Sequence, residues 1–138
     1  MAQEAQQTRK PTVLVVDDEL YIRRALGRVL ARQGYRVLDA GGGQDALAVA
    51  EEEHIDIALV DLKMPGMSGH EVLSALKRVT PRTECIMMTA YHTPEDAFQA
   101  LHAGAYDYFE KPIEDWVRFN QILRKALDMQ ALKMDMSA

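Results

Sequence analysis

Hydrophobic residues follow two alternating patterns along most of the chain. Short apolar runs, often β-branched, stand between longer segments in which apolar residues recur three and four positions apart. The first such segment carries them at Ile22, Ala25, Leu26, Val29 and Leu30. Continuous apolar runs indicate strands buried on both faces, whereas spacings of three and four indicate amphipathic helices. The pattern therefore predicts strands that alternate with helices.

Five strands and five helices are predicted in this way. The predicted strands cover 13–16, 35–40, 55–60, 85–88 and 106–109, and the second of them is the weakest. The helices cover 22–30, the region around 46–50, 72–79, 94–103 and 113–134, with turns or loops at 41–43 and 63–69. At about 1.5 Å per residue the last helix is roughly 33 Å long and overshoots the domain. Its overhang is interpreted as a dimerisation segment, a linker or a frayed tail.

Alternating strands and helices with short connections predict a parallel sheet covered by helices on both faces. For a single domain of this length we expect the flavodoxin-like doubly wound α/β fold, with five strands in the order 2-1-3-4-5. The predicted domain is 12–130, preceded by a flexible leader at 1–11 and followed by a helix extension or linker at 131–138. Ligands bind such folds at the carboxyl ends of the strands, near the first and third.

Composition narrows the classes of function. The net charge of −5 argues against direct binding of nucleic acid, which favours a basic face. No apolar run approaches the roughly 20 residues that span a bilayer, and the first ten residues lack the apolar core of a secretion signal. A lone cysteine, Cys85, excludes an internal disulfide and fits a reducing cytoplasm. We expect a cytoplasmic protein with no membrane contact.

Polar residues follow four of the predicted strands at the same end. Asp17 and Asp18 follow the first strand, Asp61 the third, Thr89 the fourth and Lys111 the fifth. Three carboxylates held together repel one another, and a hard divalent cation, best fitted by Mg²⁺, would relieve that repulsion. A carboxylate such as Asp61 can attack phosphorus, while Lys111 and Thr89 could stabilise the phosphoryl oxygens. Taken singly, the acidic pair could equally be a helix cap and Lys111 a surface lysine.

Four stretches of sequence carry a family resemblance. They are 13–19 (VLVVDDE), 61–69 (DLKMPGMSG), 88–91 (MTAY) and 104–112 (GAYDYFEKP). Together they make the chain resemble the receiver domain of two-component response regulators over about residues 12–130. The sequence around Tyr108 and after Asp61 is most similar to that of the nitrogen-regulation class of response regulators.

The resemblance implies a role for each residue of the metal-dependent step. Asp61 matches the phosphoacceptor, Asp18 the direct ligand of Mg²⁺ and Asp17 its largely water-mediated partner. The backbone carbonyl of Lys63 matches the third protein ligand. Lys111 matches the characteristic lysine of this family, which commonly precedes a cis-proline, here Pro112.

The resemblance also implies a switch. Thr89 matches the hydroxyl that moves toward the phosphoryl group, and Tyr108 matches the aromatic residue that follows it, although Tyr108 could instead be a core residue. Lys63 and Tyr91 lie where receivers tune dephosphorylation. Trp116 is either a core anchor or part of a partner surface.

The implied partners are a sensor histidine kinase or a phosphotransfer protein, an output domain or downstream effector, and a second copy through the last helices. The alternative is a magnesium-dependent phosphohydrolase with an aspartyl nucleophile. Such enzymes usually carry an acid two residues after the nucleophile, where this chain has Lys63. A flavin-binding module is disfavoured because Asp17 and Asp18 would repel its phosphate. A metal-independent scaffold also remains open. We expect no turnover of an external substrate.

Overall fold

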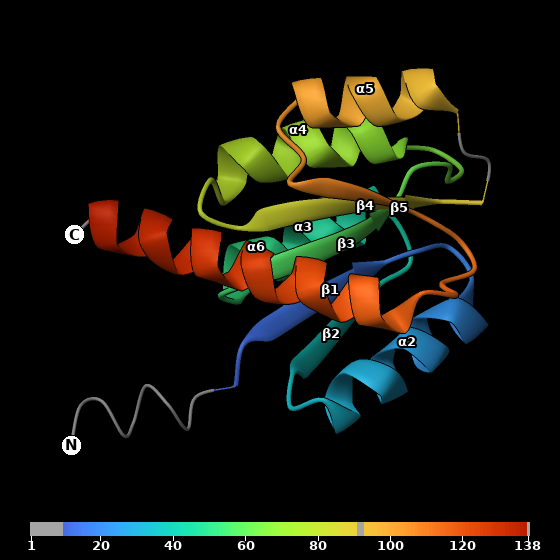
Figure 1. Cartoon of the computed structure of the whole chain (residues 1–138). Helices are drawn as coiled ribbons and strands as arrows, with labels where there is room; N and C mark the ends of the chain where they lie inside the picture. The colour runs from blue at the N-terminus through green and yellow to red at the C-terminus, as the bar shows by residue number, and fades with distance from the viewer. Residues whose placement is uncertain (1–9, 91–92, 138) are drawn as a thin grey trace.

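A five-stranded parallel sheet forms the centre of the molecule (Figure 1). The computed structural model describes residues 10–90 and 93–137. The strands are β1 (Thr12–Val16), β2 (Arg36–Ala40), β3 (Ile57–Asp61), β4 (Glu84–Thr89) and β5 (Asp107–Glu110). Their order is β2-β1-β3-β4-β5, which confirms the predicted flavodoxin-like topology and places the weak second strand at an edge.

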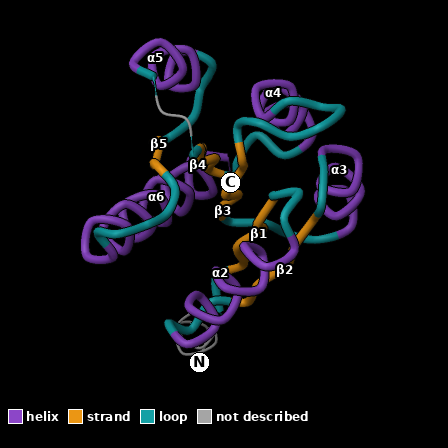
Figure 2. Tube along the Cα trace, turned by 90° about the vertical axis from the view of Figure 1, so that its right-hand side faces the viewer, coloured by secondary structure: helices purple, strands orange, loops and turns teal. Residues whose placement is uncertain are grey.

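Helices cover both faces of the sheet (Figure 2). They are α2 (Leu20–Arg32), α3 (Gly43–Glu52), α4 (Gly69–Val79), α5 (Pro94–His102) and α6 (Trp116–Ser137). α2 and α6 lie on one face, and α3, α4 and α5 lie on the other. Among the described residues, no helix combines the length and the apolar character needed to cross a membrane.

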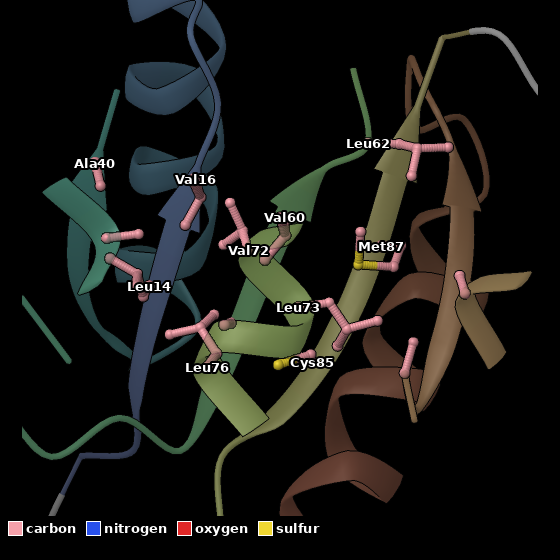
Figure 3. Close-up of a cluster of buried hydrophobic side chains, with 14 of the residues drawn as sticks. Leu14, Val16, Ala40, Val60, Leu62, Val72, Leu73, Leu76, Cys85 and Met87 are labelled. Carbon is pink, nitrogen blue, oxygen red and sulfur yellow. The ribbon is translucent and has the colours of Figure 1, made fainter. Parts of the chain in front are cut away.

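Alternation along each strand divides the core into two clusters. In β1, Val13 and Val15 face α2 and α6, whereas Leu14 and Val16 face the other three helices. All four are completely buried, because helices cover both faces of the sheet. Figure 3 shows the cluster on the face covered by α3, α4 and α5. Three side chains of α4 pack in it against the sheet: Val72, Leu73 and Leu76.

Side-chain caps set the ends of several helices. Ser68 and Glu71 form a capping box at the start of α4, and the Thr93 hydroxyl accepts the Asp96 amide at 3.0 Å at the start of α5. The prediction that the last helix begins at residue 113 is wrong, since α6 begins at Trp116. The Asp115 carboxylate accepts the Arg118 amide at 3.0 Å, and this cap fixes the first turn three residues later than periodicity indicated.

The last turns of α6 run past the end of the sheet (Figure 1) but keep contacts with the start of β4 and with the loop before it. The helix has 22 residues, which corresponds to roughly 33 Å. Gln130 is buried, Lys133 forms an ion pair with the buried Glu84 at the start of β4, and Arg82 contacts the sulfur of Met134 at 3.4 Å. The helix is therefore held to the domain as far as Met134.

The turn into α4 depends on a glycine packed against backbone. A Cβ at Gly69 would lie 2.5 Å from the Asp61 carbonyl oxygen and 2.5 Å from the Leu62 Cα, so the end of β3 would have to shift. A Cβ at Gly27, inside α2, would come no closer than 3.6 Å to its nearest neighbour, the Val37 Cγ1 atom. The close approach of α4 to the end of β3 therefore requires Gly69.

We predict that Gly69→Ala lowers the free energy of unfolding by about 1–3 kcal/mol, because an added methyl group must displace backbone. Gly27→Ala is the matched control: it adds the same methyl group inside a helix and should leave the free energy of unfolding unchanged or raise it by up to about 1 kcal/mol. Urea unfolding of both variants tests this. Equal losses at the two positions would contradict the role assigned to Gly69.

Candidate functional site

The polar residues predicted from four strands meet at one edge of the sheet. Asp17 directly follows β1, Asp61 is the last residue of β3, Thr89 is the last of β4 and Lys111 directly follows β5. Because the strands are parallel, their carboxyl ends lie at the same edge, beside the point where the chain order reverses between β1 and β3. The topology therefore brings together residues that are up to 94 positions apart in sequence.

The ammonium group of Lys111 joins two carboxylates. Its Nζ atom lies 2.7 Å from Asp17 Oδ2 and 3.4 Å from Asp61 Oδ2, and its side chain is only 10% exposed. The Lys111 amide donates to the Thr89 carbonyl at 2.7 Å, which continues the pairing of β5 with β4. The Lys111–Pro112 peptide is cis, as the resemblance implied.

Asp17 is held through each of its polar groups. Its amide donates to the Ala40 carbonyl at 3.1 Å, and its own carbonyl accepts from Arg23 Nη1 at 2.7 Å. Its Oδ1 accepts the Glu19 amide at 2.9 Å, and its Oδ2 accepts from Lys111. The residue is completely buried, so its side chain is held in one position in the site.

Asp61 is buried, and its pKa is unusually high for an aspartate. Burial, the largest cause, and then the negative charge of Asp17 raise its pKa from 3.8 to a net value of about 6, while Lys111 opposes both effects. The Lys63 amide lies 3.5 Å from Asp61 Oδ1 and also favours the charged form. Asp61 is consequently ionised at neutral pH but protonates readily on mild acidification.

The pKa of Lys111 is shifted in the direction that preserves its charge. Burial alone would lower this pKa, but the hydrogen bond and charge of Asp17, and then those of Asp61, outweigh it. The net shift is upward, so the ammonium remains charged at physiological pH. It offsets part of the repulsion between the two carboxylates.

The loop after β1 presents three acids whose carboxylate oxygens lie within 4.8 Å of one another: Asp17, Asp18 and Glu19. Asp18 and Glu19 are exposed, so water can complete the shell of a bound ion. This oxygen-rich, partly hydrated donor set fits a hard divalent cation such as Mg²⁺. Asp61 stands outside this close group and reaches Asp17 through Lys111.

Glu19 was missed as a candidate ligand, although it directly follows the predicted pair of aspartates. Arg23 and Asp39 were missed as well, because their contact with this loop depends on how α2 and β2 pack. The predicted role of the Lys63 carbonyl as a ligand stays a prediction. Tyr91, predicted to influence dephosphorylation, lies outside the described residues.

The two predicted switch residues are both inside the protein. Thr89 is completely buried and stands one residue beyond Met88, the residue of β4 that pairs with Asp61. Tyr108 is 6% exposed and packs in the cluster between the sheet and the helices α3 to α5. Burial, followed by the charges of Asp96 and Glu110, raises the Tyr108 pKa. This inward position suits a core aromatic, and the switch role stays a prediction.

A cavity of about 460 Å³ adjoins the site between α2 and the segment that follows β5. Its walls are mainly apolar side chains of α2, together with Lys111, Pro112 and Trp116. Trp116 is 37% exposed and packs edge-to-face on Phe119 at 5.4 Å. It is both a packing residue and part of an open wall, and its indole lines the same cavity as Lys111.

Known proteins share both the sequence and the fold. The chain matches the response regulator receiver domain over residues 13–124. It is 39% identical over 123 residues to the regulatory protein AtoC of Escherichia coli (strain K12), an alignment that covers 89% of this chain and 26% of AtoC. The chain thus spans about a quarter of the length of that relative.

Solved structures give the same result. The CheY-like response regulator receiver domain protein of Methanospirillum hungatei JF-1 superposes with a TM-score of 0.82 at 33% identity, covering 91% of this chain and 99% of that one. NtrX of Brucella abortus gives a TM-score of 0.85 at 28% identity, covering 94% and 30%. The likeness to NtrX agrees with the predicted nitrogen-regulation class. This chain belongs to the family of response regulator receiver domains, the phosphoacceptor domains of two-component signalling.

Proposed function

We propose that Asp61 accepts a phosphoryl group from a phosphohistidine of a sensor histidine kinase or phosphotransfer protein. The observation that supports this most directly is the geometry of Asp61, a buried carboxylate at the edge of the sheet with the Lys111 ammonium 3.4 Å away. A nucleophile in this position has a fixed cation beside the point where phosphoryl oxygens gather charge.

In the transfer step a carboxylate oxygen of Asp61 forms a bond to phosphorus as the bond between phosphorus and the donor nitrogen breaks. The electron pair of the broken bond stays on the imidazole nitrogen. Asp61 must be ionised to attack, and its pKa of about 6 allows this at neutral pH. The Lys111 ammonium, which contacts the free carboxylate before transfer, then pairs with the phosphoryl oxygens. Its positive charge offsets the negative charge that builds up on them.

We propose that Mg²⁺ is the cofactor, held by Asp18, Asp61 and the Lys63 carbonyl, with Asp17 acting largely through water. Glu19 belongs to the same acidic group and is a further candidate ligand. When bound, Mg²⁺ would neutralise negative charge on the phosphoryl oxygens and on the acids around them. The buried Asp17 keeps the loop in register by its contacts with Lys111 and the Glu19 amide.

The proposed output is a change between two conformations. A phosphoryl group on Asp61 adds charge and acceptor oxygens, and the Thr89 hydroxyl turns toward them. Tyr108 then occupies the space that Thr89 leaves, and the surface of β4, α5, β5 and α6 changes its partner preference. An output domain, an effector or a second copy through α6 would read this change. Exposed Met129 and Leu132 on α6 suit such a contact.

We propose a cytoplasmic switch that turns over no external substrate. The alternative phosphohydrolase needs a general acid near the nucleophile, and the residue two positions after Asp61 is Lys63. Incubation with a generic phosphate ester and Mg²⁺ separates the two: steady release of phosphate would favour the enzyme. A metal-independent scaffold predicts no effect of Mg²⁺ on the fluorescence of Trp116.

The acceptor is tested by intact mass after incubation with acetyl phosphate and Mg²⁺. The parent chain should gain the mass of one phosphoryl group, and Asp61→Asn should gain none, since an amide is not a nucleophile toward phosphorus. Asp56→Asn is the matched control, because Asp56 is also buried but bonds to the Thr12 amide at the opposite end of β1. Phosphorylation of Asp61→Asn at the parental rate would exclude Asp61 as the acceptor.

The raised pKa of Asp61 predicts a pH-dependent stability difference in metal-free protein. The folded state favours the neutral acid, so ionisation destabilises it as pH rises from about 4 to about 6. Asp61→Asn removes this cost and should raise the free energy of unfolding at pH 7.5 by about 1–3 kcal/mol. Below about pH 4 the two proteins should converge.

Urea unfolding in EDTA across this range is the measurement, and Mg²⁺ should stabilise the parent more than the variant. A constant difference from pH 4 to pH 7.5 would show that Asp61 titrates normally in the folded protein.

The proposed switch is tested with Thr89→Val, which removes the hydroxyl and keeps the shape. This variant should still accept a phosphoryl group, but the environment of Tyr108 should no longer change. Fluorotyrosine resonances, with Tyr108 assigned by Tyr108→Phe, report that environment with and without beryllofluoride. A parental change in Thr89→Val would contradict the coupling of these two residues.

A further inference from the structure

Arg23 of α2 connects the acidic loop to β2, the edge strand that pairs with β1. Its Nη1 donates to the Asp17 carbonyl at 2.7 Å, and its Nε donates to Asp39 Oδ2 at 2.9 Å. Asp39 lies in β2, one residue before Ala40, whose carbonyl accepts the Asp17 amide. The peptide groups on both sides of Asp17 are therefore tied to β2, directly on one side and through Arg23 on the other.

The guanidinium group suits this place because it offers several donors in a fixed plane. The Arg23 side chain is 16% exposed and its bond to the Asp17 carbonyl is partly buried, whereas the Asp39 carboxylate at its other end is 52% exposed. The carbonyl it holds belongs to the peptide between Asp17 and Asp18, and the direction of that peptide sets where the Asp18 carboxylate can point. Arg23 contacts neither Asp61 nor the acidic carboxylates of the loop through any contact found in the described residues.

We propose that Arg23 is a positioning residue for the cation site: it fixes the Asp17–Asp18 peptide so that the acids of the loop are arranged before Mg²⁺ binds. This rests on the proposed metal site and adds a residue that acts through backbone. Partners of this indirect kind typically contribute about 10- to 100-fold to metal affinity. We expect the lower end, because one carbonyl contact is involved.

The sign of the effect separates positioning from simple electrostatics. Arg23 carries a positive charge near a site for a cation, so charge alone predicts that its removal tightens Mg²⁺ binding. Positioning predicts the opposite: Arg23→Gln should weaken binding about tenfold. The double variant Arg23→Gln with Asp39→Asn removes one charge of each sign, leaves the net charge unchanged and should weaken binding similarly.

The experiment is a Mg²⁺ titration of the whole chain, followed by Trp116 fluorescence and by calorimetry. Arg24→Gln is the matched control: Arg24 is the next residue, carries the same charge and is exposed, with no ion pair to any described carboxylate. It should leave the dissociation constant unchanged. Unfolding in EDTA checks that each variant is folded, and Arg23→Lys replaces Arg23→Gln if the latter does not fold, since one ammonium cannot reproduce both bonds.

Amide hydrogen exchange supplies a readout that needs no metal. The Glu19 amide donates to Asp17 Oδ1 inside the loop, so loss of Arg23 should speed its exchange in metal-free protein while β1 amides stay protected. If the parent binds no Mg²⁺, the proposed cofactor is wrong, and Glu19 exchange alone decides the role of Arg23. Unchanged exchange at Glu19, or unchanged or tighter Mg²⁺ binding by folded Arg23→Gln, would overturn the inference.

Discussion

The contact of the Lys111 ammonium with Asp17 and Asp61 is the interaction on which the site depends. It joins the end of β5 to the ends of β1 and β3, and it keeps two buried carboxylates beside each other. Without a cation between them, these acids would repel at close range in a poorly solvated place. The ion pair thus supports the shape of the sheet edge and, in the proposed function, the reactivity of Asp61.

The site carries a stability cost that the proposed function explains. A pKa of about 6 for Asp61 means that burial and Asp17 together oppose its charge more strongly than Lys111 favours it. In the proposed function, a bound cation or a phosphoryl group beside Lys111 would change this balance, so ligands at the site would shift the energy of the folded state. A protein arranged in this way would suit switching, because phosphorylation of Asp61 would change its stability.

Asp17 differs from its neighbour Asp18, although the two aspartates are adjacent in sequence: Asp17 is held in place by the fold. It is the buried member, and its amide, carbonyl and both carboxylate oxygens all have partners in the fold. Asp18 and Glu19 are exposed beside it. The neighbours differ because Asp17 directly follows β1 and is covered by its contacts with β2 and Lys111, whereas the following residues belong to a loop open to solvent. One fixed carboxylate beside two hydrated carboxylates would suit an ion that keeps several waters, such as the proposed Mg²⁺.

The sequence by itself determined the elements, because buried strands, amphipathic helices and glycine turns are local patterns. It also determined the sheet order and the edge at which Asp17, Asp61, Thr89 and Lys111 gather, because strands that alternate with helices over short connections favour the doubly wound fold. It placed the start of α6 too early, since periodicity does not register the Asp115 cap. Only the tertiary structure decided that Lys111 lies between two acids, that Tyr108 points inward and that Arg23 reaches the Asp17 carbonyl. Those facts depend on distances between segments remote in sequence, which packing sets and local pattern does not encode.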